Sequence, residues 1–66
     1  MKISIQDRVF IKEDIQLNLA EIPKGSSGKV RDKATYPGVG EQGYLVDFGD
    51  GLEVWCAESN LSLEVV

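Results

Sequence analysis

Residues 43–56 read GYLVDFGDGLEVWC, two runs of alternating side chains on either side of Gly49-Asp50-Gly51. Alternation with period two is typical of a β-strand that buries one face. Asp-Gly is a strong hairpin signal, because Gly accepts the positive φ that tight hairpin turns require. The stretch therefore predicts two antiparallel strands, 43–48 and 52–56, joined by a tight turn.

The parity of these two strands assigns each side chain to a face. The side chains expected to face inward are Tyr44, Val46, Phe48, Leu52, Val54 and Cys56. Those expected to face outward are Leu45, Asp47, Glu53 and Trp55. An outward tryptophan among charged residues marks a candidate contact surface.

The same alternation predicts three further strands, at residues 7–12, 28–33 and 62–66, with one turn of 3₁₀ helix at 57–61 before the last of them. Their apolar positions are Val9, Ile11, Val30, Leu63 and Val65. The outward parity of the first strand carries Arg8, Phe10 and Lys12.

A long segment, residues 13–24, separates the first two strands. Its apolar side chains are Ile15, Leu17, Leu19 and Ile22. Some of these fit a helical stripe, but the segment is short and is ended by Pro23 and Gly25. We expect an extended excursion that packs these side chains over one end of the fold.

Short strands separated by turns indicate a small all-β barrel or sandwich. A long first loop, a Gly-rich loop, a tight hairpin and a 3₁₀ turn before a short final strand are together typical of SH3-like barrels. We predict a single domain over residues 1–66, folded as a small five-stranded SH3-like β-barrel with a 3₁₀ turn before the last strand. Closure of the sheet would remove exposed edges.

Charge and composition narrow the functional classes. The chain of 66 residues carries seven Lys and Arg against eleven Asp and Glu, a net charge of −4. This balance disfavours nucleic-acid binding, which depends on neutralising phosphates, and docking to anionic lipid. No apolar run approaches the roughly 20 residues of a membrane helix. The N-terminus lacks the apolar centre of a signal peptide. We expect a cytoplasmic protein with no membrane association.

The residues available for catalysis are few. The absence of histidine removes the commonest general base and the commonest zinc ligand. Cys56 is the single cysteine, and we expect it to be a small buried side chain rather than a nucleophile. The carboxylates around the hairpin lack the ligand pattern of a calcium loop. We predict no catalytic residue, no metal site and no cofactor.

Three aromatic side chains are the candidate partner-binding residues: Phe10, Tyr36 and Trp55. Phe10 and Trp55 fall on the polar parity of their strands, and Tyr36 lies in a Gly-rich loop. The leading hypothesis is a non-enzymatic module that uses them to bind a protein partner or a second copy of the chain. The alternative is that residues 13–24 fold over Phe10 and Trp55, and that the Tyr36 segment is only a connection.

A nucleic-acid-binding barrel is another alternative. It would use Lys29, Arg31 and Lys33, which strict alternation places on one strand face. Three basic side chains on one face are more often a solvated surface.

The stretch 23–61 resembles small bacterial SH3-like proteins of the DUF4926 type. The similar elements are Lys24-Gly25, Gly28-Lys29-Val30, the strand Tyr44–Phe48, and Glu58 through Leu61. The chain is also similar to the NifZ nitrogen-fixation accessory family, at Gly28–Asp32, Tyr44–Phe48, Cys56, Glu58 and Leu61. NifZ-type proteins assist maturation of the nitrogenase iron–molybdenum protein by binding it. This chain lacks much of that family's N-terminal pattern, so the role is not carried over to it.

Plasmid-type dihydrofolate reductases are small SH3-like barrels whose four copies form one shared pore. The strand Leu52–Cys56 takes the place of that family's Val-Gln-Ile-Tyr-Pro motif. Glu53 occupies the position of the motif's glutamine and Trp55 the position of its tyrosine, so the motif is not matched. An oligomeric enzyme with a shared pore is retained as the alternative from another functional class.

Overall fold

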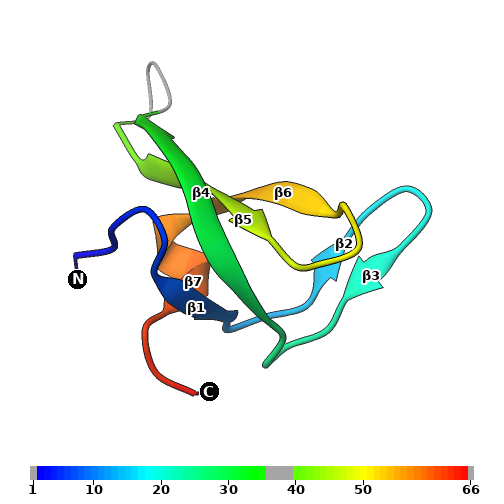
Figure 1. The fold of residues 1–66 in the computed structure, drawn as a ribbon. Helices are drawn as coiled ribbons and strands as arrows, with labels where there is room; N and C mark the ends of the chain where they lie inside the picture. The colour runs from blue at the N-terminus through cyan, green and yellow to red at the C-terminus, as the bar shows by residue number, and fades with distance from the viewer. Residues whose placement is uncertain (1, 36–39, 66) are drawn as a thin grey trace.

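The computed structural model describes residues 2–35 and 40–65, and within them the fold is all-β, as predicted (Figure 1). The elements are β1 (Arg8–Ile11), β2 (Ile15–Gln16), β3 (Glu21–Ile22), β4 (Ser27–Thr35), β5 (Gln42–Asp47), β6 (Glu53–Ala57), the 3₁₀ turn η1 (Glu58–Asn60) and β7 (Leu61–Ser62). A five-stranded antiparallel sheet has the order β6-β5-β4-β1-β7, and β2 pairs with β3 in a separate two-stranded sheet.

The predicted hairpin joins β5 to β6. Asp50 and Gly51 both have positive φ, 53° and 79°. The N–H of Phe48 donates to the carbonyl of Leu52 at 2.8 Å, and the N–H of Leu52 donates to the carbonyl of Gly49 at 2.9 Å. Positive φ at both central residues matches the right-handed twist of the flanking strands, so this turn sets the register of β5 on β6.

The strand β4 is the long central element, and it pairs with β1 on one side and β5 on the other (Figure 1). Its register on β5 shifts between Val30 and Asp32, which leaves Arg31 in a bulge. Before the bulge Lys29 lies opposite Asp47, and after it Lys33 lies opposite Tyr44. Tyr44 is buried and Asp47 is on the other parity, so Lys29 and Lys33 lie on opposite faces.

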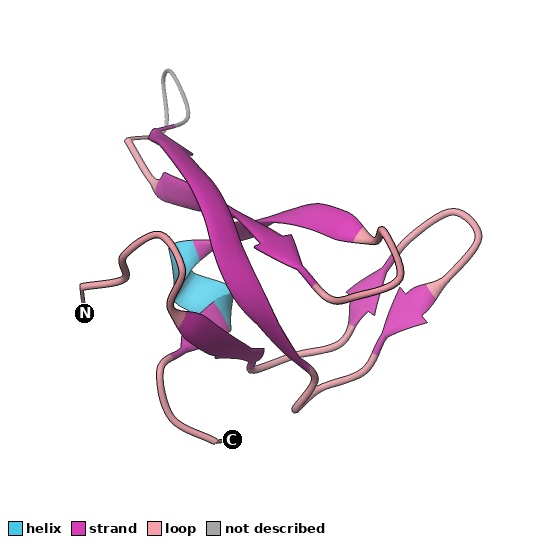
Figure 2. Ribbon diagram, viewed as in Figure 1, coloured by secondary structure: helices cyan, strands magenta, loops and turns pink. Residues whose placement is uncertain are grey.

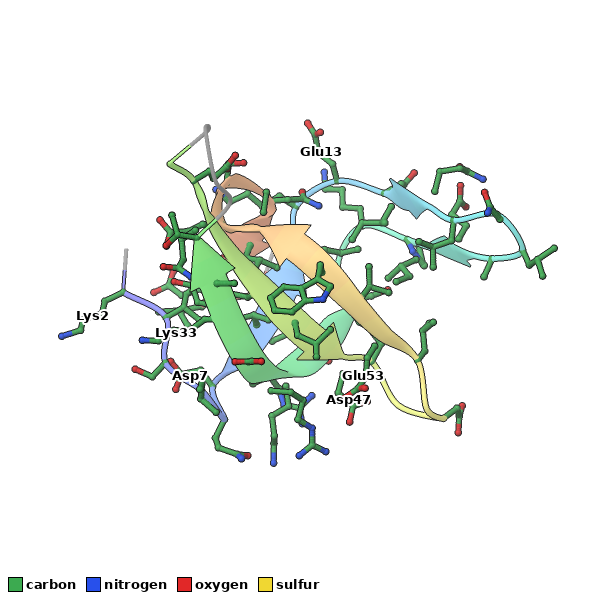
Figure 3. All side chains as sticks on the ribbon, turned by 90° about the horizontal axis from the view of Figure 1, so that it is seen from above. Lys2, Asp7, Glu13, Lys33, Asp47 and Glu53 are labelled. Atoms are coloured by element: carbon green, nitrogen blue, oxygen red, sulfur yellow. The ribbon has the colours of Figure 1, made fainter. Side chains whose placement is uncertain are left out.

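This bulge corrects one prediction. Strict alternation placed Lys29, Arg31 and Lys33 on one face, and an extra residue in the strand reverses the parity after it. Figure 3 shows Lys33 on one side of the molecule, well away from Asp47 and Glu53. The nucleic-acid hypothesis required these three basic side chains on one strand face, and that prediction is therefore wrong.

The core lies beneath the sheet and takes side chains from both ends of the chain. Its fully buried members are Val9, Ile11, Val30, Val46 and Leu61. Ile3 is buried as well, although it precedes the first predicted strand. The inward prediction is confirmed for Tyr44 and Cys56, which are buried, whereas Leu52 is 36% exposed. Leu52 directly follows the turn, at the open end of the sheet, where few side chains cover it.

The excursion between β1 and β4 is a small hairpin of β2 and β3, which extends to one side of the large sheet (Figure 2). Ile22 is buried, and Ile15 and Leu17 pack against the core. Leu19, expected to pack there too, is fully exposed. It lies in the turn that the Leu17 N–H closes on the Ala20 carbonyl at 2.8 Å, so it points to solvent.

The end of the chain differs from its prediction. The 3₁₀ turn lies within the expected residues, but the last strand is β7, not 62–66. Leu61 is fully buried and pairs with Ile11, whereas Leu63 and Val65 are exposed. The Ser62 hydroxyl donates to the carbonyl of Glu64 at 2.8 Å and accepts from its N–H at 3.1 Å, and this turn ends the strand.

In the part of the chain that the structure describes, no helix has the length and apolar character needed to cross a membrane.

Candidate functional site

Trp55 lies on the outer face of β6, where it is 45% exposed. The register places Leu45 of β5 beside it and Asp32 of β4 beyond Leu45. In the next row of the same face, Asp47 lies between Glu53 of β6 and Lys29 of β4. We call this surface of Asp32, Leu45, Asp47, Glu53 and Trp55 the Trp55 face.

The carboxylates of the Trp55 face differ in whether they have a partner of opposite charge. Asp47 accepts bonds from Arg31 Nε at 3.2 Å and Nη2 at 2.9 Å, and from the Gly49 N–H at 2.8 Å. The backbone N–H of Gly49, and then Arg31, hold the pKa of Asp47 below its usual value. Asp47 is therefore an ionised carboxylate whose charge is met within the protein, whereas Asp32 and Glu53 are exposed at the rim of the aromatic patch.

Phe10 lies on β1 and is half-buried, between Ser27 of β4 and Ser62 of β7. Two strands, β4 and β5, separate β1 from β6 in the sheet. Neighbouring strands lie about 4.8 Å apart, so Phe10 and Trp55 do not form an adjacent pair. Tyr36 falls outside the described residues. Of the two predicted aromatics that the structure describes, Trp55 lies on the Trp55 face and Phe10 does not.

The reactive groups inside the sheet have structural roles. Cys56 is buried, and burial raises the pKa of its thiol to about 11. A thiol with that pKa is protonated at neutral pH, which confirms Cys56 as a buried apolar side chain. The Tyr44 hydroxyl donates to Glu58 Oε2 at 2.9 Å, and burial together with this carboxylate raises the pKa of Tyr44.

A second surface was not foreseen from the sequence. Two pockets, of about 260 and 360 Å³, adjoin at Ser27 and Phe48, and we call the two together the groove. The first is lined by Arg8, Lys29, Arg31 and Asp47, and the second by Ile22, Pro23 and Leu52, among other residues. Only the pairing of β1 with β4 brings Arg8 and Lys29 together, so no local sequence signal marks the groove.

Metal-binding groups are not gathered in the described residues: within 2–35 and 40–65, no three His, Cys, Asp or Glu side chains are placed to hold one ion.

No family model matches the chain, and no curated protein or solved structure matches it either. The resemblances to DUF4926-type and NifZ proteins therefore stay predictions. The function has to be argued from the geometry of the two surfaces.

Proposed function

We propose that this chain is a non-enzymatic binding module that docks a protein partner on the Trp55 face. The supporting observation is the 45% exposure of Trp55 beside Leu45, on a surface formed by paired, regular strands. Tryptophan is enriched among the residues that dominate binding energy, because its large rigid area is buried at little entropic cost. A sheet face also holds such an anchor more firmly than a loop does.

The charges at the rim define the partner. Asp32 and Glu53 flank the aromatic patch, and Asp47 is already neutralised by Arg31. A complementary partner surface presents apolar side chains with Lys or Arg at the edge. Such a cation can lie over the indole of Trp55 as well as against the carboxylates.

The fold behind this surface is, we infer, an SH3-like barrel. The supporting features are the order β6-β5-β4-β1-β7, the β2–β3 excursion after the first strand, and the 3₁₀ turn before β7. An experimentally determined structure tests this inference. A sheet that closes on itself supports it, and a sheet that stays open refutes it.

Replacing Trp55 with Ala tests the proposed function. Tagged wild type, Trp55→Ala and Leu19→Ala are compared for capture of partners from lysate, with quantitation by mass spectrometry. Leu19 is the matched control, because it is an exposed apolar residue on the separate β2–β3 hairpin. Trp55→Ala should lose the captured protein and Leu19→Ala should keep it.

A second variant keeps the proposal testable if Trp55→Ala does not fold. Glu53→Lys reverses a rim charge on an exposed side chain and leaves the apolar contacts in place. Both variants are checked for folding by the dispersion of amide resonances. The proposal is wrong if folded Trp55→Ala and folded Glu53→Lys both capture the partner as well as wild type does. It is also wrong if Trp55→Ala fails to fold and Glu53→Lys still captures it.

Light scattering on a sizing column separates a foreign partner from a second copy. A monomer leaves the Trp55 face available and excludes the shared-pore enzyme. A dimer that Trp55→Ala converts to a monomer identifies the partner as another copy of this chain.

A further inference from the structure

The groove beside the β5–β6 hairpin combines a basic half with an apolar half. Ser27 and Phe48 line both pockets, so the two halves adjoin at these residues. The groove lies apart from Trp55, which lines neither pocket. A ligand placed here has to satisfy both halves at once.

The basic half of the groove has a local charge opposite in sign to the net charge of the chain. Arg8, Lys29 and Arg31 line it with a single carboxylate, Asp47, although the whole chain has a net charge of −4. That carboxylate is held by Arg31 at 2.9 Å. Arg8 and Lys29 therefore leave a local excess of positive charge.

Arg8 and Lys29 also lie directly opposite each other on β1 and β4. Like charges in this position destabilise a sheet. In the described residues, the ion pair within 4.0 Å at this surface is Arg31 with Asp47. Lys29 lies opposite Asp47 on its other side and helps to lower the pKa of Asp47, but makes no ion pair within that distance to a described residue. Arg8 Nη1 donates to the Ser27 hydroxyl at 3.3 Å, which directs its guanidinium along the groove. A bound anion would remove this repulsion, and local conflicts of this kind are expected at functional sites.

The apolar half adjoins these cations. Phe48 is half-buried, Pro23 and Leu52 are exposed beside it, and the acidic residue Glu21 also lines this half. Each half is at or near the lower end of the roughly 300–1,000 Å³ of typical small-molecule sites, which suits one side chain or one charged group.

We propose that this groove binds a protein segment in which a carboxylate lies next to an apolar side chain. The carboxylate contacts Arg8 and Lys29, and the apolar group lies against Phe48 and Leu52. A phosphate would satisfy the basic half alone and leave the apolar half uncovered. This inference does not rest on the Trp55 face, since the ligand contacts Arg8, Lys29, Phe48 and Leu52, and only Asp47, which is paired with Arg31, belongs to both surfaces.

The first test uses small probes at constant ionic strength, followed by amide chemical shifts. N-acetyl-leucine carries both groups, acetate only the charge, and N-acetyl-leucinamide only the apolar side chain. We expect saturable shifts at Lys29 and Phe48 with N-acetyl-leucine, weaker binding of acetate and of inorganic phosphate, and no saturation with the amide. Phosphate binding tighter than N-acetyl-leucine would overturn the proposal in favour of a phosphate site. Linear, unsaturating shifts with every probe would overturn it altogether.

Matched variants assign the binding to the groove. Lys29→Gln should weaken N-acetyl-leucine binding by about two- to fivefold, the upper part of the range for one exposed ion pair. Lys33→Gln makes the same charge change on the same strand but on the other face, and should leave binding unchanged. Leu52→Ser should erase the preference for N-acetyl-leucine over acetate. Equal losses in Lys29→Gln and Lys33→Gln would reduce the effect to net charge and refute the site. Trp55→Ala should bind the probe normally, so failure here is separable from failure of the Trp55 face.

Discussion

Gly28 is the position where the close packing of the sheet can be tested most directly. A Cβ at this position of β4 would lie 2.5 Å from Val46 Cγ1 and 2.7 Å from the carbonyl oxygen of Asp47. Favourable contacts between carbons lie at about 3.5–4.0 Å, so the added methyl overlaps its neighbours by about 1 Å. Val46 is fully buried and the other obstacle is backbone, so neither can move aside freely.

The expected cost of Gly28→Ala follows from this overlap. Overpacking of a tight core costs about 1–3 kcal/mol. A chain of 66 residues has a total stability of roughly 3–10 kcal/mol at the usual value per residue. At about 4–8 °C per kcal/mol for a small domain, the melting temperature should fall by roughly 5–20 °C. Thermal unfolding followed by circular dichroism measures this fall, with Ser26→Ala as a control that adds no volume.

A double-mutant cycle identifies the cause. Val46→Ala removes the methyl nearest to the added Cβ, so Gly28→Ala should cost less in the Val46→Ala background than in wild type. A melting temperature of Gly28→Ala equal to that of Ser26→Ala would refute the close approach. A full loss with no coupling to Val46 would show that the contact with the side chain is not its source.

Three further predictions concern the hydrogen bonds, the buried thiol and the turn. Tyr44→Phe removes the donor of Glu58 and should lower the free energy of unfolding by about 1 kcal/mol in urea titrations; an unchanged midpoint would contradict a role for this bond. Because burial raises the pKa of Cys56 from 9.0 to about 11, its contribution to stability is complete below pH 9 and is lost as the pH rises toward 11. Cys56→Val should flatten this part of the pH profile, and an identical profile would show that other groups cause the loss. Asp50→Val places a β-branched residue at a φ of 53° and should cost roughly 1–2 kcal/mol, whereas Asp50→Gly should be tolerated; equal midpoints for the two variants would rule out backbone strain at this turn.

The hairpin shows which parts of the structure local sequence can predict. Asp50-Gly51 sets the turn, the turn sets the register, and the register places Trp55 outward and Cys56 inward. Each step depends on residues within a few positions of one another. The turn signal and the alternation together were therefore sufficient for β5, β6 and the exposed tryptophan, but not for the exposed Leu52.

The last strand shows where alternation is not sufficient. Leu61, Leu63 and Val65 share one parity, so the pattern cannot say which of them pairs with β1. Pairing with Ile11 and the turn from Ser62 to Glu64 select Leu61. The groove was missed for a related reason, because Arg8 and Lys29 are far apart in sequence and meet only through strand pairing.

The bulge at Arg31 decides which charges lie beside Trp55. Without the extra residue, Lys29, Arg31 and Lys33 would all project from the face that carries Trp55, and the aromatic would be flanked by cations. With it, Asp32 takes the place beside Leu45 and Lys33 turns to the opposite face. Arg31 then reaches Asp47, which borders both surfaces, and neutralises the carboxylate nearest to the groove. One inserted residue thus places Asp32 instead of a cation beside Leu45, while Lys29 stays on that face in the row of Asp47 and Glu53.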